Sequence, residues 1–134
     1  KKALFLSDAD WAGNPVFVTS SLRDCITSFE MMKALTEAGV VDLLLPAHGP
    51  IKEGADAILP HLDFHIRRLE TMRNEVLALH HESGSKDVRR LTKTLVRHSP
   101  LFRLLKGSNF PRFVCFVHNV VALSLIEEGI LATD

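Results

Sequence analysis

An apolar run that leads directly into a proline, a histidine and a glycine is the feature that most restricts how this chain can fold. The run covers residues 40–45, and the motif Pro-Ala-His-Gly-Pro follows at residues 46–50. A segment this apolar predicts a strand buried on both faces of a sheet, as in layered α/β proteins. The motif then places His48 at the tip of the strand, where glycine permits a close approach of the backbone.

A second strand of the same kind is predicted near the start of the chain. Residues 3–6 are apolar and lead directly into Ser7 and Asp8. Asp10 also lies just past this strand, and alternation along an extended chain puts Asp8 and Asp10 on the same side. The residues alone leave the choice between these two aspartates open. Each predicted strand therefore ends in a candidate metal ligand.

Carboxylate oxygen and imidazole nitrogen suit a divalent transition metal, above all zinc, with both ligand atoms about 2.0–2.2 Å from the ion. A zinc centre that acts on a substrate normally has three protein ligands and one open position. The two strand ends supply only two ligands. A working site therefore needs residues from elsewhere.

The order of these features resembles the second half of the metallo-β-lactamase fold hydrolases: a buried strand ending in aspartate, a helix with a polar start, a second buried strand and Pro-Ala-His-Gly-Pro. In that family the aspartate bridges two metal ions and the last histidine holds one of them, which implies these roles for Asp8 and His48. The resemblance selects Asp8 because the family's ligand directly follows the last small residue of the strand. Asp10 then supports the ligands or the turn, and Trp11 either lines the mouth of the active site or covers the sheet.

The family's His-x-His-x-Asp-His signature does not occur in residues 1–134. We therefore expect the chain to be the carboxyl-terminal part of a hydrolase and to be inactive alone. The resemblance implies two divalent metal ions in the intact protein, with zinc preferred and iron or manganese as alternatives. It also implies a metal-bound hydroxide that attacks a small-molecule ester, thioester, amide or phosphodiester. The missing amino-terminal half, or a second copy of the chain, is the expected partner.

The spacing of apolar residues predicts helices over most of the remaining chain. One is expected to start at about residue 21 and to end at a left-handed glycine cap, Gly39. A longer helix is expected to have Pro60 in its first turn and to end near His81. Two more are expected over about residues 87–98 and 111–128.

The predicted fold class is α/β over residues 1–58, as part of the αββα sandwich of the metallo-β-lactamase fold, followed by an all-α module over residues 59–134. The last helix, stopped by Gly129, and the segment after it are similar to the winged-helix-like module that follows the catalytic fold in one branch of the family. The segment Phe64-His65-Ile66-Arg67-Arg68 resembles, loosely, the histidine-arginine pair that opens that module.

Charge and cysteine content restrict the partners and the compartment. Sixteen basic and sixteen acidic residues balance, so the whole chain has no field that would attract nucleic acid or a membrane. Locally, residues 86–112 carry eight basic residues against one acid, Asp87, and this stretch supports an alternative function as a helical module that binds a protein or nucleic acid. A solvated helix face is the preferred reading of that stretch. Cys25 and Cys115 are expected to be reduced thiols, and the absence of a signal or membrane segment favours the cytoplasm.

The histidines of the helical part are expected to have structural roles. His61 and His65 are four residues apart and share a helix face, a spacing that can hold zinc. The glutamate that accompanies such a pair in zinc peptidases is absent between them. We therefore expect packing or hydrogen bonding, rather than metal binding, from this pair.

Overall fold

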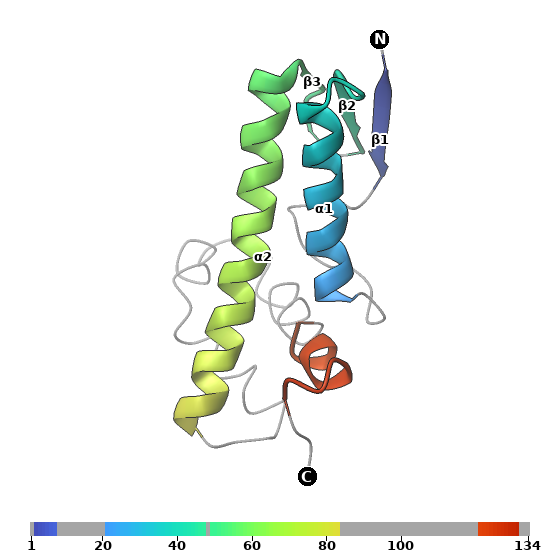
Figure 1. Cartoon of the computed structure of the whole chain (residues 1–134). Coiled ribbons are helices and arrows are strands. Elements are labelled where there is room, and N and C mark those ends of the chain that lie inside the picture. Colours follow the sequence, from blue (N-terminus) through green and yellow to red (C-terminus); the bar gives the residue numbers. More distant parts are fainter. Residues whose placement is uncertain (1, 8–20, 48, 84–120, 132–134) are drawn as a thin grey trace. The chain divides into compact units, whose positions relative to one another are not determined.

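The computed structural model describes residues 2–7, 21–47, 49–83 and 121–131 of the chain. Its labelled elements, drawn in Figure 1, are β1 (Ala3–Ser7), α1 (Leu22–Glu37), β2 (Leu43–Pro46), β3 (Lys52–Glu53) and α2 (Ala55–Ser83). A further stretch, residues 121–127, is also helical. In the described ranges the protein is thus a mixed α/β structure that is mostly helical and has one small sheet of three strands.

The sheet has the strand order β1-β2-β3, and α1 connects the two parallel strands β1 and β2. The register pairs Phe5 with Leu45 and Ser7 with Pro46, with an irregularity between Phe5 and Ser7. β3 runs antiparallel to β2 and pairs Lys52 with Leu44. Because β1 and β2 are parallel neighbours, their carboxyl ends lie at the same edge of the sheet.

The helix α1 begins and ends where the apolar spacing predicts. Its last turn is closed by Gly39, which has a φ of 68° and donates its backbone N–H to the carbonyl of Thr36 at 3.0 Å. The backbone N–H of Val40 reaches back to the carbonyl of Leu35 at 2.9 Å. This is the left-handed cap that glycine supplies without steric cost, so the predicted helix and its stop are both confirmed.

The helix α2 begins earlier than predicted. Its first residue is Ala55, so Pro60 lies inside the helix and the prediction that Pro60 occupies the first turn is wrong. Gly54, at a φ of 79°, turns the chain and donates its backbone N–H to the carbonyl of Asp42 at 2.9 Å. Proline has no N–H, so Pro60 leaves one backbone carbonyl of the preceding turn without its helical donor. The end of α2 at Ser83 agrees with the predicted stop.

The backbone contacts divide the chain into two compact units, and α2 contributes to both. Residues 22–70 belong to the first unit with the strands, whereas residues 71–134 belong to the second. The predicted boundary at residue 58 lies within the continuous helix α2, and a domain division there stays a prediction.

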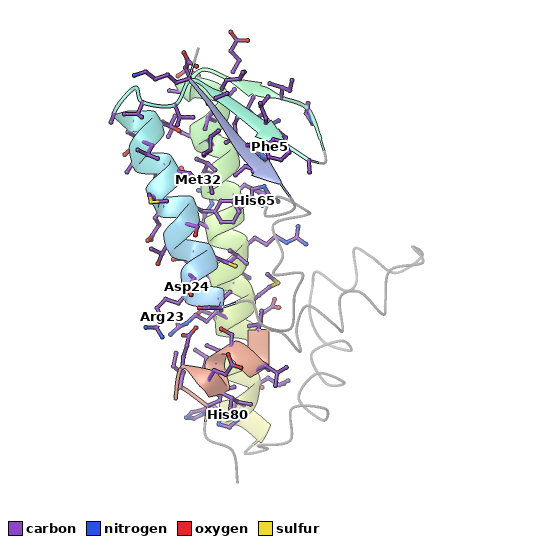
Figure 2. The ribbon with its side chains drawn as sticks, turned by 90° about the vertical axis from the view of Figure 1, so that its right-hand side faces the viewer. Phe5, Arg23, Asp24, Met32, His65 and His80 are labelled. Atoms are coloured by element: carbon purple, nitrogen blue, oxygen red, sulfur yellow. The ribbon has the colours of Figure 1, made fainter. Side chains whose placement is uncertain are left out.

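The first unit has its core between the helices and one face of the sheet. Figures 1 and 2 show α1 and the first part of α2 on the same side of the strands. The side chains of Leu6, Leu44, Phe29, Leu62 and Leu69 are all buried. The apolar faces of the two helices thus cover this face of the sheet.

The described part of the second unit also has a buried apolar set. Val121, Ala122 and Leu125 are fully buried, and Leu131 nearly so. Gly129, with a φ of 70°, ends the helical stretch, and the backbone N–H of Leu131 bonds to the carbonyl of Leu125 at 3.0 Å. The predicted stop at Gly129 is confirmed. The helix expected over residues 87–98 lies outside the described ranges.

Candidate functional site

The carboxyl ends of β1 and β2 are where the sequence predicts metal ligands. Ser7 and Pro46 pair across the two strands. In the sequence Asp8 follows Ser7 directly, and His48 follows Pro46 after one residue. Asp8 and His48 themselves lie outside the described residues. The structure therefore brings together the strand ends from which the two candidate ligands continue.

Two further candidates, Asp10 and Trp11, also fall outside the described ranges. The roles of Asp10 beside the ligands and of Trp11 at the mouth of the site stay predictions. The basic stretch of residues 86–112, on which the alternative function depends, also lies outside the described ranges.

Gly49, in the predicted ligand motif, has a backbone requirement of its own. Its φ is 123°, a region that residues with a Cβ atom rarely adopt. A Cβ atom added there would meet no atom within 4 Å in the described structure. This glycine therefore has a role in the turn, and a close approach of the backbone at the candidate site stays a prediction.

One face of the sheet is open in the described part of the chain. Phe5 is 67% exposed, whereas its strand partner Leu45 is half-buried. Ile51, directly before β3, is 62% exposed. The helix-facing side chain of Leu44 is fully buried. Burial on both faces, as the apolar runs predict, is thus present on one face only.

The histidine pair on α2 makes packing contacts. His65 is 3% exposed and stacks on Phe29 of α1, with ring centroids 5.4 Å apart and planes at 14°. Its ring meets His61 edge to face at 4.6 Å, and Phe64 in the same manner at 5.3 Å. Figure 2 shows His65 within the helical layer. An edge-to-face contact directs the edge of one imidazole at the face of the other, which does not bring two nitrogen lone pairs to one point.

The burial of His65 was not predicted as such, although the sequence contains a signal for it. His65 lies three residues after Leu62 and four before Leu69, and both leucines are buried. That spacing places all three side chains on one helix face. The sequence predicts only that His65 packs or forms hydrogen bonds. Its position in this apolar stripe is the signal that would have placed it in the core.

An ion pair joins α1 and α2. The Lys33 Nζ atom lies 2.8 Å from Asp63 Oδ1, and about a third of each side chain is exposed. The hydrogen bond from Lys33 lowers the pKa of the Asp63 carboxyl, and the same bond raises the pKa of Lys33. Both groups are therefore charged near neutral pH, and the pair fixes the two helices rather than providing an acid or a base.

Among the described residues, Cys25 and Arg68 also have shifted pKa values, and both shifts come mainly from burial. Burial raises the pKa of the Cys25 thiol, and the charge of Asp24 raises it further. The thiolate is the reactive form, so this cysteine is a poor nucleophile at neutral pH. Burial also lowers the pKa of Arg68, whose Nε atom has no hydrogen-bond acceptor in the described structure.

Comparisons with models of protein families, with curated proteins and with solved structures found no match. Within residues 2–7, 21–47, 49–83 and 121–131, no group of three or more His, Cys, Asp or Glu side chains is arranged to hold a metal ion. Among the helices that the structure describes, none combines the length and the apolar character needed to cross a membrane.

Proposed function

We propose that this chain is the carboxyl-terminal part of a metal-dependent hydrolase of the metallo-β-lactamase fold, in which Asp8 and His48 are metal ligands. The observation that carries the proposal is the pairing of Ser7 with Pro46 at the carboxyl ends of two parallel strands. The sequence motifs predicted ligands at two strand ends, and these strand ends are neighbours.

The strand spacing allows the two ligands to share a metal centre. Neighbouring strands lie about 4.8 Å apart, and each residue extends the chain by at most about 3.6 Å. Asp8 is one residue past Ser7, and His48 is two residues past Pro46. Side chains that start so close together can reach a common ion with bonds of about 2.0–2.2 Å.

The chemistry of the donors fits a hydrolytic metal centre. A carboxylate with two oxygens can bridge two ions, as the resemblance implies for Asp8, and a neutral imidazole nitrogen, as in His48, is a common ligand of zinc. Bound zinc would supply a hydroxide at neutral pH and would polarise the bond to be cleaved. Two ligands leave the coordination incomplete, so the proposal requires the His-x-His-x-Asp-His residues from a part of the protein that these 134 residues do not include.

The open face of the sheet also supports the proposal. An αββα sandwich has helices on the outer face of each sheet and packs the inner faces of the two sheets against each other. The sheet described here has helices on one face and the exposed Phe5 on the other, and the exposed Ile51 directly precedes β3. In the proposed fold, the second sheet would cover these two side chains.

The proposed function is tested on the longest gene product that contains these residues. We expect it to bind zinc stoichiometrically and to hydrolyse at least one member of a panel of esters, thioesters, amides and phosphodiesters. Asp8→Asn and His48→Ala should each lower the metal content and reduce the hydrolysis rate by at least a hundredfold, because each removes a ligand. His80→Ala, near the end of α2, is the matched control and should leave both unchanged. Full metal content and full activity in both ligand variants would refute the assignment.

The convergence of the two ligands is tested separately by a disulfide. Both native cysteines are replaced by alanine, and Asp8→Cys is combined with His48→Cys. A disulfide requires Cα atoms within about 7 Å, so oxidation should cross-link the pair. The control is Ser7→Cys with Pro46→Cys, at positions that the register pairs. A cross-link in the control but none between positions 8 and 48 would place these two Cα atoms farther apart than the neighbouring strand ends predict.

A further inference from the structure

No further inference is drawn: the strongest candidate, the open apolar face of the three-stranded sheet around Phe5 and Ile51, carries none, because nothing in the structure shows what covers it.

Discussion

The small sheet and the carboxyl-terminal helical stretch differ in how completely they bury their apolar side chains. In the helical stretch Val121, Ala122 and Leu125 are fully buried. In and beside the sheet, Phe5 and Ile51 are more than three-fifths exposed. A helix has one apolar stripe and needs one neighbour, whereas an apolar strand has two faces and needs cover on both. The described helices supply cover for only one of those faces.

The cost of the open face can be estimated from the side chains involved. Full burial of a phenylalanine or isoleucine side chain stabilises a protein by about 1.5–3 kcal/mol relative to exposure. Most of that gain is not realised for Phe5 and Ile51. Within the described residues, the open face therefore stands to gain from association, and Phe5 and Ile51 are more exposed than Leu123 and Ile130 of the carboxyl-terminal stretch.

The largest expected effect is in the well-buried helical stretch. Leu125→Asp puts a carboxylate at a position that is fully buried and should destabilise the protein by several kcal/mol, on the order of 3–5. Leu123→Asp, on the same helix but 38% exposed, is the matched control and should cost far less. Urea unfolding followed by circular dichroism measures both. Equal losses in the two variants would mean that this stretch has no closed core.

The next effect compares the two faces of the sheet. Leu44→Ala removes a fully buried side chain and should cost about 2–5 kcal/mol. Phe5→Ala removes a larger side chain from the neighbouring strand, but this side chain is 67% exposed, so the loss should stay below about 1 kcal/mol. The free energy of unfolding is compared at low protein concentration, where association is weakest. A Phe5→Ala loss as large as that of Leu44→Ala would show that the open face is covered within the chain itself.

Local spacing was sufficient to predict α1, with its glycine cap, and the end of α2. These features depend on residues a few positions apart, such as Gly39 and the turn before it. The strand β3 was not predicted, because Lys52 and Glu53 have no apolar alternation and are in a strand only through their pairing with β2. The start of α2 was misplaced because the turn at Gly54 has a stronger influence than Pro60 on where the helix begins.

The candidate site could be predicted only as far as its strands. The apolar runs predicted β1 and β2, whereas their parallel pairing was not predicted and was found only in the structure. The register of Ser7 with Pro46 could not be obtained from either strand alone, because register depends on contacts between the strands. Missing cover for the sheet was expected, because two apolar strands and one helix cannot complete a layered sheet. The strand sequences could not show that Phe5 would be among the exposed side chains.

A smaller effect is expected on self-association. Phe5→Thr combined with Ile51→Thr makes the open face polar while keeping residues that favour strands. We expect the double variant to be more monomeric than the wild type, because apolar surface of this kind promotes association. Sedimentation velocity over a concentration series measures the change. Met31→Gln is the control, since Met31 is 59% exposed on α1 and is not part of the open face. If the control reduces association as much as the double variant, the sheet is not the surface responsible.

The smallest effect concerns the ion pair between α1 and α2, which is about one-third exposed to solvent and therefore weak. The pKa of Asp63 is lower in the folded protein than its ordinary value of about 4. The pair therefore stabilises the fold fully at pH values above that ordinary pKa. This contribution is lost as the pH falls further, through the folded pKa. Asp63→Asn should therefore be slightly less stable than the wild type at pH 7, and the difference should shrink below pH 4. The exposed Asp56, in the first turn of the same helix, provides the control variant Asp56→Asn. Urea unfolding of each variant from pH 7 to pH 3 measures the free energy of unfolding. A loss for Asp63→Asn that stays constant with pH would show that the pair with Lys33 does not help to join the two helices. The same conclusion would follow if Asp56→Asn reproduced the loss.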